Sequence, residues 1–296
     1  LSAGDYSHIS DVLCALLVEE NPGIPPTSVS LPSLRMDSFD SGLAEAIRRV
    51  RRTGFTFAPE AGTERLRRVI NKRITHDDIL RTVARVARAG WPSIKLYFMI
   101  GLPTETQEDI EGIVGTVKDV MDTAREARGK GVKITLSIAA FVPKAFTPFQ
   151  WEAYRGTEYI DEVQRCILSR VPRRVQVRLH AKEVSFLEAI FARGDARLAD
   201  VIEEAYRRGR RFDDRSERMD LDVWMAAFAA AGIDPHAYCA EIPDNEALPW
   251  DVLDCGVTKE FLRRERQRAR EGSATPSCRD GVCVNCGVQR WGVCGA

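Results

Sequence analysis

Apolar residues along this chain occur either in short continuous runs or at helical spacing. The short runs are β-branched or aromatic, which is typical of strands. They predict strands at Val29–Leu31, Phe55–Ala58, Ile94–Ile100 and Ile134–Val142. Between the runs, apolar residues recur every three or four positions, which predicts amphipathic helices around residues 43–50, 79–86 and 110–120.

Two of these helices begin with a capping-box pattern, Thr75 with Asp78 and Thr106 with Asp109. Strands and helices therefore alternate, and the strands start roughly 26 to 40 residues apart. Such βα units build a parallel sheet, either an open doubly wound sheet or a barrel. Both architectures place a functional site at the carboxyl ends of the strands.

The second half of the chain has a different pattern. A strand-like segment, VQVRLH, is followed by apolar helical spacing at residues 184–191, 198–206 and 221–231. We therefore predict an α/β domain over residues 1–170, a mainly helical extension over 171–270 and a Cys-rich tail over 271–296.

Glu60 and Gly62 stand where the second predicted strand turns into a helix. A carboxylate in this place can accept hydrogen bonds from ribose hydroxyls or an amine, and a glycine lets a ligand approach the backbone. A second interpretation stays open, in which Glu60 caps its own helix and Gly62 only makes the turn.

The other predicted strand ends are rich in glycine and proline. FMIGLPTET leaves the third strand and AAFVPKAFTPFQW leaves the fourth, and such turns either expose backbone groups to a flat heterocycle or simply connect elements. At the start of the chain, Gly4 and Asp5 stand where a still earlier strand would end. Asp5 could bind an amine or cap the helix that follows it.

Length and composition fit a globular protein. With 296 residues, 44% of them apolar, the chain can bury a large core. No run approaches the ~20 apolar residues of a membrane helix and no signal segment opens the chain, so we expect a cytoplasmic protein.

The chain starts at Leu1 in what looks like the end of a strand, which predicts a fragment. Net charge is zero, but basic runs at residues 48–52 and 207–211 allow nucleic acid as a partner.

Four of the eight cysteines lie close together at the carboxyl end: Cys278, Cys283, Cys286 and Cys294. Their spacing, C-x4-C-x2-C-x7-C, with a glycine after the third, predicts a metal-binding tail. Zinc, an iron–sulfur cluster and unliganded or disulfide-paired cysteines all remain open. Four thiolates would close the coordination sphere, so the site would be structural or an electron relay.

Four ordered segments resemble the radical S-adenosylmethionine enzymes: SLPSLRMDSF, TFAPEAGTERLRRVINK, YFMIGLPTET and FVPKAFTPFQW. They are most similar to the cobalamin-linked radical proteins, in the branch near the methylthiotransferases and the elongator-type tRNA modifiers. The resemblance covers about residues 1–170. It implies a partial (β/α)6 barrel that lacks its first strands, because the chain aligns from the end of the family's second strand.

The resemblance also implies roles at the strand ends. Gly4 and Asp5 would lie beside the methionine amine, and Glu60 and Gly62 beside the ribose and methionyl part of S-adenosylmethionine. The remaining positions that it assigns to the cofactor or substrate are Ser33, Arg35, Ile100, Gly101, Leu102, Phe141 and Val142.

One defining motif of the family is absent from the sequence. The C-x3-C-x2-C triplet holds a [4Fe–4S] cluster that supplies the electron for radical formation, and residues 1–60 contain no such triplet. We therefore expect a radical enzyme present as a fragment, inactive by itself, with RNA as a candidate substrate, a separate electron-donor protein, and cobalamin in the full-length protein. The alternative is a binding or scaffold protein that keeps the barrel and the tail without radical chemistry.

Overall fold

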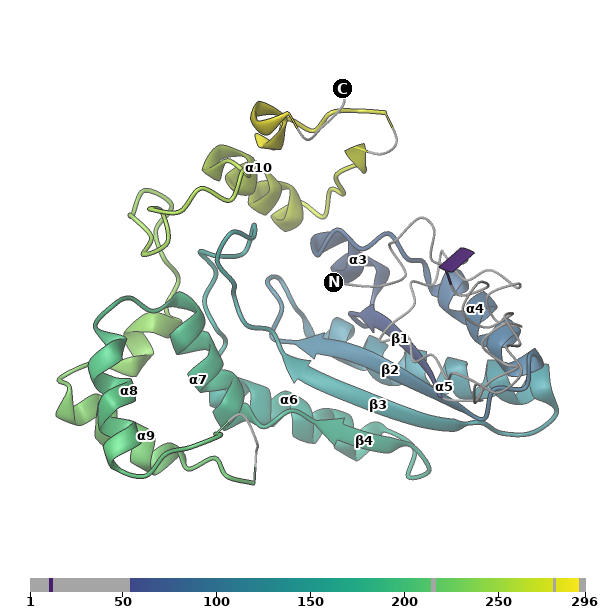
Figure 1. The fold of residues 1–296 in the computed structure, drawn as a ribbon. Helices are drawn as coiled ribbons and strands as arrows, with labels where there is room; N and C mark the ends of the chain where they lie inside the picture. The colour runs from purple at the N-terminus through teal and green to yellow at the C-terminus, as the bar shows by residue number, and fades with distance from the viewer. Residues whose placement is uncertain (1–10, 13–53, 214–216, 279–280, 293–296) are drawn as a thin grey trace, which may run out of the picture.

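The computed structural model describes residues 11–12, 54–213, 217–278 and 281–292 (Figure 1). Its described strands form one parallel sheet in the order β1-β2-β3-β4. The strands are β1 (Phe55–Glu60), β2 (Ser93–Ile100), β3 (Lys133–Ala140) and β4 (Gln176–Leu179). The predicted strands near residues 55, 94 and 134 are confirmed as adjacent and parallel, whereas the one predicted at Val29–Leu31 lies outside the described residues.

Helices follow the strands as predicted, and both capping boxes are confirmed. Thr75 and Asp78 exchange backbone-to-side-chain hydrogen bonds of 3.0 and 3.1 Å at the start of α4. The Thr106 amide donates to Asp109 Oδ2 at 2.8 Å at the start of α5. The helices around the sheet are α3 (Glu64–Val69), α4 (His76–Arg88), α5 (Gln107–Arg128) and α6 (Thr157–Arg170). The helix predicted around residues 43–50 lies outside the described residues.

The two faces of the sheet are buried to different extents. Alternate residues of β1 and β2 are fully buried, and they belong to one apolar core with the inner faces of α4, α5 and α6. The intervening positions, such as Thr56, Lys95 and Tyr97, are only half-buried. Figure 1 shows α5 and α6 on the same face of the sheet. Helices on one face and a less buried opposite face fit a partial barrel better than a doubly wound sheet.

The rest of the chain forms a helical lobe and a cover. α7 (Lys182–Arg193), α8 (Leu198–Arg207), α9 (Leu221–Ala230) and the 3-10 helix η2 (Pro235–Cys239) form the lobe beyond β4 (Figure 1). α10 (Lys259–Arg270) and the 3-10 helix η4 (Val288–Trp291) lie above the carboxyl ends of the strands. In the described parts of the chain, no helix has the length and apolar character that a membrane span requires.

Candidate functional site at the carboxyl edge of the sheet

Three adjacent strands bring the predicted motifs to one edge of the sheet. β1 ends at Glu60, which pairs with Phe98 of β2, and β2 and β3 end in register at Ile100 and Ala140. One residue further, the Phe141 amide donates to the Ile100 carbonyl at 2.8 Å. The turns after β1, β2 and β3 therefore start side by side, as the resemblance implies.

Glu60 has an unusual backbone conformation. Its φ of 69° lies in the left-handed region, which is uncommon for a residue with a side chain, and the pairing of β1 with β2 shifts register just before it. Such conformations cost of order 1 to 3 kcal/mol and cluster at functional sites. The Glu60 side chain is 28% exposed, and its Oε1 accepts a hydrogen bond from Lys72 Nζ at 3.2 Å.

Thr63 takes the capping role that one interpretation gave to Glu60. Thr63 Oγ1 accepts a hydrogen bond from the Leu66 amide at 3.2 Å, and Thr63 is the N-cap of α3. Glu60 therefore does not cap α3. Its carboxylate reaches the segment after α3 through Lys72, and its predicted contact with S-adenosylmethionine stays a prediction.

Gly62 is needed for packing against α5. A Cβ atom on Gly62 would lie 2.0 Å from the Asp109 carbonyl oxygen and 2.5 Å from the Ile113 amide nitrogen. On the facing helix, a Cβ on Gly112 would lie 2.8 Å from the Gly62 carbonyl oxygen. The two glycines thus let the turn after β1 touch the α5 backbone. This steric requirement explains Gly62 without a ligand, and its predicted contact with the cofactor is untested.

Asp109 ties the turn after β1 to the turn after β2. Its carboxylate, which is 1% exposed, accepts hydrogen bonds from Thr63 Oγ1, from the Arg65 guanidinium and from Thr106. Arg65 also donates to the Thr104 carbonyl at 2.8 Å. Burial alone would raise the pKa of Asp109, but these donors outweigh it and hold the pKa below its usual value. Asp109 is therefore an anion that fixes two motifs relative to each other.

Gly101 opens the turn after β2 in a left-handed conformation, with φ at 81°. Its amide donates to Glu105 Oε1 at 2.7 Å, and the Tyr159 hydroxyl donates to the same oxygen at 2.7 Å. The second oxygen of Glu105 is buried and has no hydrogen-bond partner among the described residues. Burial raises the pKa of Glu105 above its usual value, although these donors oppose the rise. The buried carboxylate of Glu105 thus holds the turn after β2 in place through the Gly101 amide and links it to Tyr159 of α6.

Ile100 and Leu102 are enclosed by the protein. Both residues are 0% exposed, backbone included, and the Ile100 carbonyl accepts the Phe141 amide, so their predicted contact with an adenine ring stays a prediction. Phe141 and Val142 are half-buried, and the Phe141 ring meets the Phe149 ring edge-on with centroids 5.7 Å apart. The edge therefore presents apolar and aromatic surface at Phe141 and Val142, which suits a flat heterocycle.

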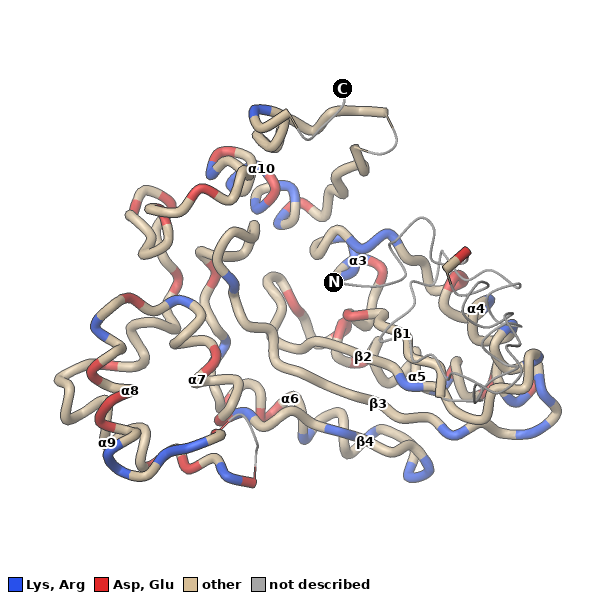
Figure 2. The backbone as a smooth tube through the Cα atoms, viewed as in Figure 1, with Lys and Arg blue, Asp and Glu red and all other residues tan. Residues whose placement is uncertain are grey.

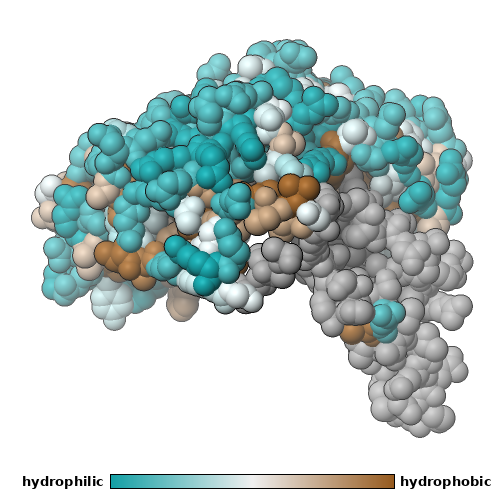
Figure 3. Space-filling view, turned by 90° about the horizontal axis from the view of Figure 1, so that it is seen from above, coloured by the Kyte–Doolittle hydropathy of each residue, from teal (hydrophilic) through white to brown (hydrophobic). Residues whose placement is uncertain are grey.

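α10 covers this edge. Its Ala269 belongs to a small apolar cluster with the strand ends and α3, and just beyond α10 the Thr275 amide donates to Asn71 Oδ1 at 3.0 Å. The other buried members of the cluster are Ala61, Leu66, Val69 and Leu102. α10 carries more basic than acidic residues (Figure 2). The side of the molecule seen from above is mostly hydrophilic (Figure 3).

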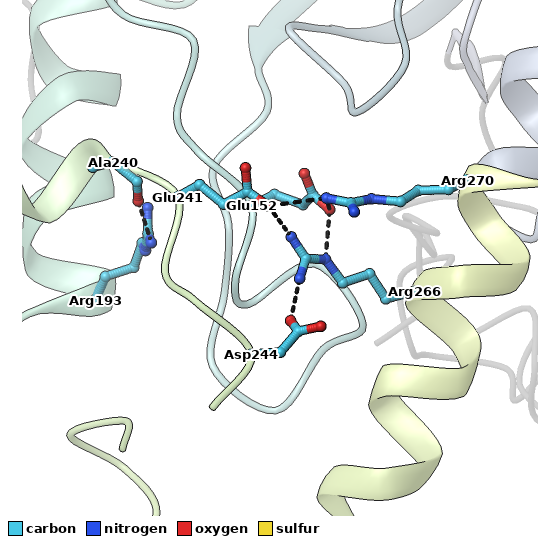
Figure 4. A network of polar contacts seen from close by, with 7 residues as sticks. All are labelled: Glu152, Arg193, Ala240, Glu241, Asp244, Arg266 and Arg270. Atoms are coloured by element: carbon cyan, nitrogen blue, oxygen red, sulfur yellow. Dashed lines mark hydrogen bonds and ion pairs between the residues drawn. The ribbon is translucent and has the colours of Figure 1, made fainter. Parts of the chain in front are cut away.

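A network of ion pairs fixes α10 (Figure 4). Arg266, whose side chain is 5% exposed, pairs with Glu152 at 2.7 Å, with Glu241 at 2.5 Å and with Asp244. Arg270 reaches the same Glu152 and Glu241 oxygens at 3.0 Å each. One buried guanidinium therefore joins α10 to the loop after β3 and to the segment after η2.

The cysteine tail is described only in part. Cys278 and Cys283 are exposed, Cys286 is half-buried, and Cys294 lies outside the described residues. The Asn285 amide points to Cys283 Sγ at 3.4 Å. Within the described ranges, no group of three or more His, Cys, Asp or Glu side chains is arranged to hold a metal ion. The predicted metal site is therefore unsupported by the described cysteines and stays a prediction.

Four predicted site residues, Gly4, Asp5, Ser33 and Arg35, lie outside the described residues. The structure brings together Glu60, the Ile100–Leu102 backbone, Phe141 and Val142. The sequence patterns do not indicate the contributions of Thr63, Glu105, Gly112 and the α10 network. The only available signal was Asp109, because its capping box marked it as the residue at the start of α5.

Comparison with known proteins agrees with this geometry. A family model described as the radical SAM superfamily, named for S-adenosylmethionine, matches residues 4–117. The chain is also 31% identical over 207 residues to an uncharacterized protein of Methanocaldococcus jannaschii. That alignment includes 68% of this chain and 42% of the relative, so the chain spans less than half of that protein. On this evidence, residues 4–117 belong to the radical SAM superfamily.

Proposed function

We propose that the carboxyl edge of the sheet binds S-adenosylmethionine in a full-length radical enzyme. The observation that carries the proposal is the placement of Glu60, in its left-handed conformation, beside the hydrogen-bonded ends of β2 and β3. A partly exposed carboxylate can accept hydrogen bonds from hydroxyl or amine donors of the ligand, and the half-buried Phe141 and Val142 offer apolar surface at the neighbouring strand end. These groups fit the family's cofactor.

The residues of this sequence do not fit the family's iron–sulfur cluster. Residues 1–60 contain a single cysteine, Cys14, and three nearby thiolates would be required. We therefore propose the cluster and the radical chemistry only for the whole protein. Other parts of that protein would supply the cysteine ligands of the cluster. If no such segment exists, the alternative is a binding or scaffold protein with the same edge.

Replacing Glu60 tests cofactor binding directly. In the full-length protein, Glu60→Gln should weaken S-adenosylmethionine binding by roughly 10- to 150-fold, because losing a charge-assisted hydrogen bond costs about 1.5 to 3 kcal/mol. Calorimetric titration measures the affinity, and thermal melting of the same variant checks that the fold is kept.

Lys72→Met is the matched control for this experiment. It removes the observed partner of Glu60 and leaves the carboxylate in place. We expect it to keep S-adenosylmethionine affinity within a few-fold of the wild type. If Glu60→Gln and the wild type bind S-adenosylmethionine with equal affinity, the role of Glu60 is purely structural. That result would remove the main support for this proposal.

We also propose that the cysteine tail binds one metal ion or cluster through Cys278, Cys283, Cys286 and Cys294. The turn around the third cysteine supports this: Gly287 has a φ of 104°, and the Asn285 amide faces Cys283 Sγ at 3.4 Å. The tail is also held in place, since the Thr258 amide donates to the Cys286 carbonyl at 2.8 Å. A preformed turn of this kind lowers the cost of bringing thiolates to a metal.

Elemental analysis decides this second proposal. Protein purified without oxygen should carry zinc or iron in stoichiometric amount, and Cys283→Ser together with Cys286→Ser should lose it. Cys166→Ser is the control, because Cys166 lies in α6 and outside the tail. Metal-free protein, or metal retained by the double variant, would reject the site.

RNA, an electron-donor protein and cobalamin remain proposals for the whole protein. Among the described basic runs, Arg207 and Arg208 form ion pairs with Glu203 and Glu204 on the α8 surface. These pairs reduce the charge that the run offers to a phosphate backbone. The described residues therefore give RNA less support than S-adenosylmethionine.

A further inference from the structure

The face of the sheet turned away from α5 and α6 carries a group of polar side chains (Figure 1). On this face β2 presents Lys95 and Tyr97 and β3 presents Thr135 and Ser137, all of them half-buried. β4 adds Arg178, which is exposed. The inside of a barrel is usually filled by bulky, branched apolar residues, so hydroxyl groups and cations at these positions indicate a face that meets a polar ligand or water.

The strand register places four of these groups in one row. Tyr97 of β2 pairs with Ser137 of β3, and Ser137 pairs with Arg178 of β4. Lys95 stands beside Thr135, two residues before Tyr97 along β2, but its ammonium reaches the same row. Lys95 Nζ donates to the Tyr97 hydroxyl and lies 4.2 Å from the centre of the Tyr97 ring. The backbone of this row spans about 10 Å, because neighbouring strands lie about 5 Å apart.

This row is positively charged. In the described part of the chain, neither Lys95 nor Arg178 forms an ion pair with a carboxylate. An ammonium has three donors, of which the Tyr97 hydroxyl takes one, and a guanidinium has five. The hydroxyl groups of Tyr97 and Ser137 can donate as well. Two cations and two hydroxyl groups with donors to spare complement an anion that carries several oxygen atoms.

We infer that the row of Lys95, Tyr97, Ser137 and Arg178 binds an anionic oxygen group, a phosphate or a carboxylate, of the substrate. This inference rests on the proposed function, because it places a substrate beside the edge that binds S-adenosylmethionine. Tyr97 lies three residues before the end of β2, so the row is about 10 Å from that edge. An anion held in the row lets the rest of the substrate extend towards the cofactor.

The structure leaves room for such a group at the β4 side of the row. β4 is the last strand of the described sheet, and Arg178 on it is exposed to solvent. A guanidinium can bind a phosphate or a carboxylate through two parallel hydrogen bonds. The ligand can therefore enter at Arg178 and reach Ser137 and the Lys95 ammonium on the half-buried part of the face.

Selenate, phosphate and succinate are the probes for this row. Crystals of the full chain soaked in sodium selenate should show an anomalous selenium peak within hydrogen-bond reach of Lys95 or Arg178. In solution at constant ionic strength, replacing chloride by phosphate or by succinate should raise the melting temperature by about 2 to 6 °C in a saturable way, because a ligand that binds only the folded state stabilises it. The probe that saturates at the lower concentration shows whether the row prefers phosphate or carboxylate.

The variants separate the row from general salt effects, since phosphate also stabilises folded proteins by exclusion from their surface. Lys95→Met and Arg178→Met should each lose most of the saturable shift. Arg174→Met should keep it, because Arg174 is an exposed arginine that precedes β4 and lies outside the row. Absence of a selenium peak at the row, or a shift in Lys95→Met and Arg178→Met equal to that of the wild type, would overturn the inference.

The affinity for S-adenosylmethionine distinguishes this inference from the proposed function. In the full-length protein, Lys95→Met and Arg178→Met should keep S-adenosylmethionine affinity within a few-fold of the wild type and lose the anion-dependent shift. Glu60→Gln should show the reverse. If Glu60→Gln binds S-adenosylmethionine like the wild type while the shift still depends on Lys95 and Arg178, the proposed cofactor site fails and the anion site stands. If only the cofactor result holds, the anion site fails.

Discussion

Gly62→Ala is expected to destabilise the protein by about 3 kcal/mol or more, and Gly112→Ala by about 1 to 3 kcal/mol. At Gly62 a new Cβ would lie 2.0 Å from the Asp109 carbonyl oxygen and 2.5 Å from a backbone amide of α5. At Gly112 it would meet the Gly62 carbonyl oxygen at 2.8 Å. Because the obstructing atoms are backbone, α5 would have to move away from the turn after β1.

Gly115→Ala in the same helix is the matched control. Nothing lies within 4 Å of a Cβ atom built on Gly115. Alanine favours a helix over glycine by roughly 0.5 to 1 kcal/mol, so this variant should be slightly more stable than the wild type. Urea unfolding of the three variants measures the differences. A Gly62→Ala protein that unfolds at the wild-type urea concentration would contradict the close contact.

Local sequence patterns were sufficient to predict β1, β2, β3, α4 and α5, whereas α6 was not predicted and the strand that joins the sheet as β4 was assigned to the helical extension. Alternating burial in β2 and β3 and the apolar stripe of α4 follow from periodicity within one element. The capping boxes at Thr75 and Thr106 are equally local, since their partners lie three residues away. Parallel order then follows from the lengths of the connections, which are too long for hairpins.

Contacts between distant segments could not be predicted in the same way. Gly62 looks like a turn glycine in the sequence, and its need for a small side chain arises from the α5 backbone. The left-handed conformation of Glu60 depends on the irregular pairing of β1 with β2, and Lys72 becomes its partner only when α3 turns back. Such features depend on tertiary packing, for which neither propensity nor spacing carries a signal.

The cover over the site is the clearest example of this limit. α10 is rich in charge, and its sequence gives no indication that one of its arginines is buried. The burial of Arg266 results from three carboxylates on two other segments, Glu152 after β3 and Glu241 and Asp244 after η2. The sequence thus predicts where the strands end, while the ion-pair network determines what covers them.

Arg266→Met is therefore expected to release α10 from the carboxyl edge of the sheet. Breaking a buried ion pair by removing one partner costs about 3 to 5 kcal/mol, and the exposure of Glu241 and Asp244, at 56% and 57%, reduces this to about 2 to 4 kcal/mol. Amide hydrogen exchange in α10 should accelerate by roughly 30- to 1,000-fold, because exchange follows the free energy of local opening. Methionine preserves the apolar stem of the side chain, so the effect reports mainly the lost charge.

Arg268→Met shows whether the effect belongs to the network or to charge on α10 in general. Arg268 is 46% exposed, pairs with Glu265 of its own helix at 3.2 Å and donates to Thr275 Oγ1 at 3.0 Å, just beyond the same helix. Its removal should therefore cost about 1 to 2 kcal/mol, less than that of Arg266. In Arg266→Met, amides of β2 should keep wild-type exchange, because the sheet has a separate core. If both variants exchange alike in α10, the network is not what holds the cover. If α10 and β2 accelerate together, α10 unfolds only with the whole domain, and a cover that opens separately is ruled out.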